Sequence, residues 1–235
     1  MARASNIYGG TDPAAVPAYS IPEAARFIRV PQATVRSWVL GRTYPSRTGP
    51  RSFDAVIDAA DPARRSLSFL NLVELHVLSA IRRDHGVKFD AVRKAVQFLR
   101  RRLTSRHPLA DVQMLTDGKH LFVERYRELV NVSDQGQLEM QALLGNYLKR
   151  IDRDPRGVAI RLYPFTVTHD DTDPRTIVID PRVQFGRPCI VGTGMPTALI
   201  AERHQAGDSI REIANDYGLE ADAIEEAIRY ESRAA

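Results

Sequence analysis

Cysteine is almost missing from the sequence, whose 235 residues include only Cys189. A single thiol cannot form a disulfide within the chain or a cluster of cysteine metal ligands, and it fits a reducing compartment. Long apolar runs are also missing, because no segment approaches the roughly 18 consecutive apolar residues that a membrane span needs. Residues 1–12 lack the basic and then apolar profile of a signal peptide. We therefore expect a cytoplasmic protein with no membrane partner.

Groupings of side chains that would carry catalysis or bind a metal are not visible either. Residues 169–174 combine one histidine with aspartates, but no further ligands stand at helical spacing elsewhere, so a solvated loop is favoured over a metal site. His107, His120 and His204 have no neighbouring nucleophile in the sequence. No glycine loop of the phosphate-binding kind follows a strand. The sequence predicts no catalytic residues, no metal and no cofactor, and a hydrolase is the least favoured class.

What the sequence does have is an uneven distribution of charge. Residues 1–108 contain 18 basic and 8 acidic side chains, whereas residues 109–235 contain 15 basic and 21 acidic ones. Clustered positive charge gains affinity for phosphate by releasing counterions, so the first part is expected to meet a polyanion. A merely solvated basic face would give the same count, and the choice depends on the motifs.

Two short helices joined by a tight turn are predicted near the start of the chain. Ser20 and Glu23 are spaced as a capping box with a proline in the first turn, which indicates a helix start. Pro31 ends this helix, because the residue before a proline disfavours the helical conformation. A second helix is expected over residues 32–40. Its inward-facing residues are Val35, Trp38 and Val39.

This helix-turn-helix resembles the DNA-binding head of MerR-like and excisionase-like regulators. The residues that carry the resemblance are Ile21-Pro22-Glu23-Ala24-Ala25-Arg26-Phe27-Ile28-Arg29-Val30 and Ala33-Thr34-Val35-Arg36-Ser37-Trp38. The resemblance implies that the second helix enters the major groove and that the following hairpin forms a wing on the phosphates. Pro31 stands where many relatives carry a capping residue. The residues expected to contact DNA are Gln32, Thr34, Arg36, Ser37, Arg42, Arg47 and Arg51.

Arginine suits both parts of this interface. Its guanidinium reads a guanine edge with two hydrogen bonds, and flexible arginines on a wing grip the DNA backbone. Arg36 is expected on the outer face of the second helix as a contact, although a solvated position is the alternative. Trp38 is expected in the core, whereas Arg26 and Arg29 fit phosphate contact and solvation equally well.

The middle of the chain predicts supporting helices and then strands. Helical patterns cover residues 68–84 and 89–102, which complete the core of the first domain. From residue 112 to 132, short apolar runs broken by turn sequences indicate small strands and hairpins. Residues 138–147 could form a helix and residues 158–167 another strand.

The C-terminal part begins with a short strand at 176–181 and a loop rich in glycine and proline at 183–196. Helical patterns follow at 197–205, 209–217 and 221–230, the last two joined like a second helix-turn-helix. The stretch resembles a bacterial domain of unknown function found in antitoxins that accompany PIN-like toxins, although Gly194 replaces a frequent arginine. The matching residues are Asp180-Pro181, Gly186-Arg187-Pro188, Gly192-Thr193 and Ile213-Ala214-Tyr217. With the MerR-like head, the whole chain resembles a VapB-type antitoxin.

Acidic side chains dominate the last helix and its flanks. Phosphate would be repelled by this surface, so we expect it to form a protein interface rather than to bind DNA. An ordinary solvated face is the alternative. The residues expected at a toxin or dimer interface are Arg187, Glu220, Glu225 and Glu226.

The expected fold is mainly α with small β elements (α+β). Residues 1–108 form a winged helix-turn-helix domain with supporting helices, residues 109–174 a strand-rich region and linker, and residues 175–235 a helical, helix-turn-helix-like domain. The expected function is that of an antitoxin of a type II toxin-antitoxin system, which binds operator DNA and neutralises a PIN-like ribonuclease toxin. A homodimer is expected because two-fold operators suit two-fold proteins. The alternative is a MerR-like transcriptional regulator with a ligand-sensing C-terminal region.

Overall fold

The structure is a computed structural model that describes residues 10–232 apart from 45–48, 50, 84–88 and 131–133. The predicted helix-turn-helix is present, with α1 at Ile21–Phe27 and α2 at Gln32–Leu40. The capping box also forms, because the Ser20 amide donates to Glu23 Oε2 at 2.9 Å and the Glu23 amide donates to Ser20 Oγ at 3.3 Å. An antiparallel hairpin of β1 (Arg42–Tyr44) and β2 (Arg51–Phe53) follows in the position of the wing.

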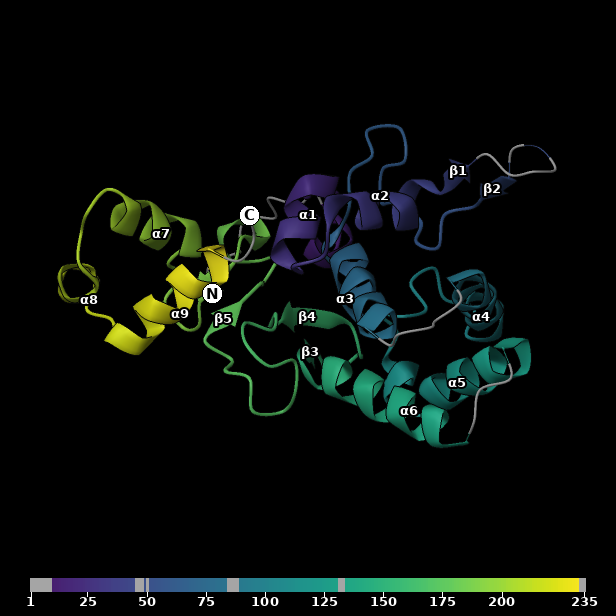
Figure 1. Cartoon of the computed structure of the whole chain (residues 1–235). Helices are drawn as coiled ribbons and strands as arrows, with labels where there is room; N and C mark the ends of the chain where they lie inside the picture. Colours follow the sequence, from purple (N-terminus) through teal and green to yellow (C-terminus); the bar gives the residue numbers. More distant parts are fainter. Residues whose placement is uncertain (1–9, 45–48, 50, 84–88, 131–133, 233–235) are drawn as a thin grey trace.

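The helix α3 (Phe69–Arg83) forms the centre of the molecule. Every side chain from residue 71 to residue 80 is buried, so this helix is surrounded on all sides, as Figure 1 also shows. The helix α4 (Phe89–Arg102) is amphipathic and ends in three arginines, where cations suit the helix dipole.

The middle of the chain is helical where the sequence predicted strands. A 3₁₀ turn at Val112–Leu115 leads into α5 (Asp117–Val130) and α6 (Asp134–Lys149), which pack on α4 and α3. The prediction of strands was wrong for residues 112–130, because Phe122, Val123 and Tyr126 follow helical spacing and are all buried. Residues 131 and 132, the end of the predicted stretch, lie outside the described residues. The expected turn at Gly118 is the first turn of α5, where an added Cβ would lie 2.9 Å from the Gln113 carbonyl oxygen.

Short two-stranded sheets close the middle region and open the C-terminal part. Strands β3 (Ile151–Arg153) and β4 (Ala159–Leu162) are antiparallel, as are β5 (Ile177–Val178) and β6 (Cys189–Ile190). One cluster of buried apolar residues runs from Ala14 to Ile179, so the segments before and after Pro108 share a core. The region that was expected to begin at residue 109 therefore shares its core with the residues before it.

The C-terminal helices have a core of their own. The helices α7 (Thr197–Gln205), α8 (Ile210–Tyr217) and α9 (Ala221–Ser232) pack around a second cluster that includes Ile200 and Tyr230. Figure 1 shows them at one end of the molecule, with α4, α5 and α6 at the other and α1 beside the end of α9. The fold is mainly α with small β elements, as predicted. Within the described residues, no helix is long and apolar enough to span a membrane.

Candidate nucleic-acid interface

The second helix of the helix-turn-helix presents a polar face to solvent. Gln32 and Arg36 are exposed, while Thr34 and Ser37 are half-buried. On the opposite face, Trp38 is 2% exposed and its ring stacks on Phe89 with centroids 5.8 Å apart. The prediction that Trp38 belongs to the core is confirmed, and this packing fixes which residues α2 can present to a ligand.

The wing is held close to the helix that precedes it. Gly41 has φ +73° and an added Cβ would lie 2.3 Å from the Phe53 carbonyl oxygen, so only glycine fits this close approach. Arg42 is exposed on β1. Arg51 stands opposite Tyr44 in the register of the hairpin, but its side chain is outside what is described. Arg47 lies outside the described residues.

A buried arginine supports the base of the wing. Arg93 on α4 is 6% exposed, donates from Nε to the Asp54 carbonyl at 2.8 Å and lies 4.6 Å from the centroid of the Phe53 ring. Sequence reasoning missed this contact, because its partners are about 40 residues away in the chain. Arg93 therefore positions the wing from inside the protein.

Arg29 holds three parts of the chain together instead of solvating α1. Its Nη1 donates to the carbonyls of Phe165 at 3.2 Å and Thr166 at 2.6 Å. Its Nη2 donates to the carbonyls of Arg229 at 3.0 Å and Tyr230 at 3.3 Å, near the end of α9. A cation at this position also suits the negative end of the α9 dipole.

A second set of contacts joins α1 to the C-terminal helices. The Tyr230 hydroxyl donates to the Phe27 carbonyl at 2.8 Å, and Arg26 Nη1 lies 3.5 Å from Glu231 Oε2. The other oxygen of Glu231 accepts a 2.5 Å hydrogen bond from the Thr197 hydroxyl. Arg26 therefore faces the C-terminal module. The sequence alone predicted only phosphate contact or solvation for this residue.

The predicted interface residues of the C-terminal module divide into exposed and buried ones. Arg187, Glu220 and Glu225 are exposed. Glu226 is only 4% exposed and pairs with Arg229, so its prediction as a surface contact was wrong. The reason is its position on the inner face of α9, beside Ala227 and Tyr230.

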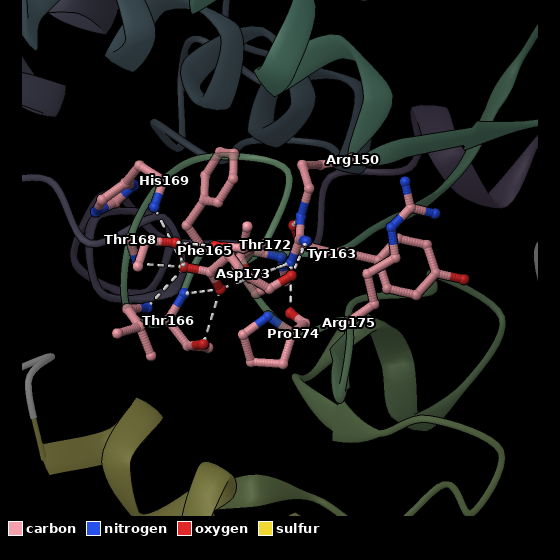
Figure 2. A network of polar contacts seen from close by, with 12 residues as sticks. Arg150, Tyr163, Phe165, Thr166, Thr168, His169, Thr172, Asp173, Pro174 and Arg175 are labelled. Carbon is pink, nitrogen blue, oxygen red and sulfur yellow. Dashed lines mark hydrogen bonds and ion pairs between the residues drawn. The ribbon is translucent and has the colours of Figure 1, made fainter.

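The loop at residues 166–173 is organised by one aspartate. The Asp173 carboxylate accepts hydrogen bonds from the amides of residues 166, 167, 168 and 169 at 2.6–3.2 Å (Figure 2). Burial alone would raise the pKa of Asp173, but these amides lower it to about 2. Both oxygens are already used by the loop, which is a structural arrangement and not a ligand set. Among the described residues, no three His, Cys, Asp or Glu side chains are grouped to hold a metal ion.

The structure gives His107 a partner that sequence reasoning missed. His107 Nδ1 lies 2.9 Å from Oε2 of Glu74, a carboxyl group on α3 that is 1% exposed. Asn71 Nδ2 donates to the same oxygen at 3.3 Å. Burial raises the pKa of Glu74, and the hydrogen bonds oppose that shift. The contact between Glu74 and His107 therefore joins α3 to the segment that follows α4.

Comparisons with known proteins match both ends of the chain. Residues 17–96 match the family model of a putative DNA-binding HTH domain, and residues 177–230 match a family of unknown function, DUF433. The HTH match begins before α1 and ends within α4, so it includes α2, the wing and the supporting helix α3.

Proteins of Mycobacterium tuberculosis are similar over almost the whole chain. Putative antitoxin VapB45 is 28% identical over 91% of this chain and 93% of its own length. Uncharacterized protein Rv2308 is 26% identical over 90% of this chain and 89% of its own length. The crystal structure of RV2018 superposes with a TM-score of 0.66 and 25% identity, covering 91% of this chain and 98% of that one. The chain is therefore similar to one putative antitoxin, VapB45, along nearly its whole length, and it matches an HTH domain near its N-terminus and DUF433 near its C-terminus.

Proposed function

We propose that the protein is a type II antitoxin that binds duplex operator DNA through α2 and the wing and represses its own transcription. The observation that carries the proposal is the exposed face of α2, where Gln32 and Arg36 stand opposite the buried Trp38. A B-DNA major groove about 12 Å wide accepts such a helix, and arginine matches a guanine edge there. The HTH match over residues 17–96 supports the same role.

The wing adds contacts to the backbone in this proposal. Arg42 is exposed at the start of the hairpin, and Gly41 fixes the direction in which the hairpin leaves α2. Arg47 and Arg51 extend the same basic strip along the sequence. Phosphate contacts of this kind position the protein and make binding depend on salt, while the residues of α2 select the sequence.

In this proposal the C-terminal module, residues 175–235, neutralises the toxin. The module is treated as a domain because its helices have a core of their own. A similar protein named as a putative VapB45 antitoxin supports the assignment, and the partner would be a PIN-like ribonuclease. Arg187, Glu220 and Glu225 are exposed there and available to a protein partner. The role is a binding one in the cytoplasm, as a homodimer on a two-fold operator, and not a catalytic one.

The DNA-binding half is tested by fluorescence anisotropy with labelled duplex from upstream of the protein's own gene, at two salt concentrations. Arg36→Ala is expected to weaken binding by roughly tenfold to a hundredfold, as for loss of a base contact worth about 1–3 kcal/mol. The matched control is Arg211→Ala, which removes an exposed arginine from α8 and is expected to leave affinity unchanged. Equal affinities for both variants would refute the assignment of α2.

The toxin-binding half is tested by co-expression with a PIN-like ribonuclease whose gene neighbours that of the protein, with rescue of growth as the readout. Glu220→Lys with Glu225→Lys is expected to abolish rescue, whereas Glu124→Lys, on the exposed face of α5, is not. A regulator that needs no protein partner would show no rescue in any form, and its operator affinity would respond to a small molecule.

A further inference from the structure

A cavity of about 440 Å³ lies directly behind the turn of the helix-turn-helix. One wall is the segment 28–31 that joins α1 to α2, and the other consists of α3, the end of α6 and the loop at 164–169. The volume lies in the range of small-molecule sites, about 300–1,000 Å³. We propose that this cavity binds a planar nitrogen heterocycle of one or two rings.

Flat rings line the cavity and lie close to one another. The centroids of His76 and Tyr147 are 4.8 Å apart, those of Tyr147 and Phe165 are 4.7 Å apart, and those of Phe165 and His169 are 5.0 Å apart. All four side chains belong to the lining. His76, Tyr147 and Phe165 are buried and support the half-buried ring of His169. An imidazole ring backed in this way favours offset or edge contact with another flat ring, and it favours a planar ligand over a flexible aliphatic one.

Polar groups on α3 give this wall hydrogen-bond acceptors. His76 is 2% exposed and its Nε2 lies 3.2 Å from the Tyr147 carbonyl, while the Ser79 hydroxyl donates to the His76 carbonyl at 2.7 Å. Burial lowers the pKa of His76 to about 3, so the ring is neutral and donates from Nε2. Nδ1 of His76 and the lone pairs of Ser79 Oγ are then acceptors. They suit a ligand with ring N–H or amino groups.

The backbone is strained on both sides of the cavity. Arg29 has φ +57° and His169 has φ +68°, a left-handed conformation that costs a residue with a side chain about 1 kcal/mol or more. The Asp173 carboxylate holds the loop that carries His169, as Figure 2 shows, and Arg29 is held by carbonyls of both neighbouring segments. Both walls are therefore fixed before a ligand arrives, which reduces the entropy lost on binding.

The position of the cavity gives it a link to the helix-turn-helix. Residues 28–31 set the angle between α1 and α2, and they are also a wall of the cavity. A ligand there would contact the segment that places α2, without contacting the exposed face of α2 itself. This link rests on the proposed function, whereas the binding site does not.

The test is a titration of 2-aminopurine with the full-length protein, without DNA. This fluorescent two-ring heterocycle has ring N–H and amino donors, and stacking on aromatic rings quenches its emission. We expect saturable quenching that His169→Asn weakens by roughly tenfold, the scale of one lost stacking partner. Asparagine tolerates the left-handed conformation at position 169, so this variant keeps the loop. The matched control is His204→Asn, an exposed histidine on α7, with no change expected.

Ser79→Ala gives an independent arm, because it removes an acceptor and leaves every ring in place. It is expected to weaken binding about fivefold, the scale of one neutral hydrogen bond. Quenching that does not saturate, or equal dissociation constants in all variants of unchanged melting temperature, would overturn the proposal. Because no DNA is present, this outcome is separate from any failure of the operator experiment.

Discussion

Replacing Arg29 by alanine is expected to loosen the junction between the helix-turn-helix and the last helix of the chain. The guanidinium donates to four carbonyl oxygens, of residues 165, 166, 229 and 230, and the hydrogen bonds to Thr166 and Arg229 are the shorter ones at 2.6 and 3.0 Å. Truncation removes the donor for all four at once. The carbonyls at the end of α9 then lose their cation as well.

The magnitude follows from the two short hydrogen bonds. A hydrogen bond to a charged group contributes about 1.5–3 kcal/mol, but Arg29 is only partly buried and water can reach some of the carbonyls. We therefore expect Arg29→Ala to lower the free energy of unfolding by about 2–4 kcal/mol. Arg29→Gly is expected to cost about 1 kcal/mol less than the alanine variant, because glycine adopts φ +57° without strain.

Urea denaturation followed by circular dichroism measures both differences. The control is Arg64→Ala, because the Arg64 side chain is 86% exposed and its ion pair with Asp61 is long at 3.9 Å. If Arg29→Ala costs no more than this control, water replaces the guanidinium at all four carbonyls. The junction would then depend on Tyr230 and the apolar contacts alone.

Further predictions follow from the loop, the wing and the core. Asp173→Asn is expected to lower the free energy of unfolding by about 2 kcal/mol, because the pKa of Asp173 is lowered to about 2 in the folded protein. The wild type has this stabilisation above pH 4 and loses it as the pH falls towards 2. Urea midpoints of both proteins at several pH values test this. Gly41→Ala is expected to weaken operator binding with little change in the melting of the remaining core, because a Cβ meets the Phe53 carbonyl; anisotropy and calorimetry together test it. Trp38→Ala is expected to lower the free energy of unfolding by about 3–5 kcal/mol, measured in urea.

The parts of the fold that sequence predicts well are those fixed by neighbours in the chain. Ser20 and Glu23 form their capping box because the two residues need only each other. The second box, at Ser209 and Glu212, starts α8 in the same way. Trp38 follows from the helical spacing of α2. These signals come from residues close together in the chain. The helix-turn-helix is specified almost entirely by such local signals, so it could be predicted from the sequence.

The middle of the chain shows where local signals mislead. Residues 121–123 and 129–132 look like short strands because apolar residues are adjacent in the sequence. In the structure residues 121–123, 129 and 130 belong to α5, whose buried face packs on α4, and residues 131–132 lie outside the described residues. An isolated run of two or three apolar residues fits the periodicity of a helix and that of a strand equally well. Only the contact with α4 decides between helix and strand here.

The candidate site divides along the same line. The exposed residues of α2 could be predicted, because solvent exposure follows from helical period. The roles of Arg26, Arg29 and Arg93 could not, because the partners that define these roles lie between 39 and 205 residues away in the chain. Glu226 failed for a related reason, since the inner face of α9 is set by its contact with α7. Charge alone does not distinguish an arginine that binds phosphate from one that holds backbone carbonyls.

This difference bears on the second helix-turn-helix of the chain, formed by α8 and α9. Its two helices meet at Gly218 in the left-handed conformation, which is a geometry that DNA-binding proteins also use. Two arginines of the C-terminal module are engaged internally, however, because Arg203 of α7 pairs with Asp208 and Asp216, and Arg229 of α9 pairs with Glu226. Arg211 of α8 is exposed, but the exposed acidic side chains of α8 and α9 outnumber it. The side chains left to face a ligand include Glu220 and Glu225. Two units of similar local shape therefore present opposite charge, and we expect only the one with exposed Arg36 to approach a polyanion.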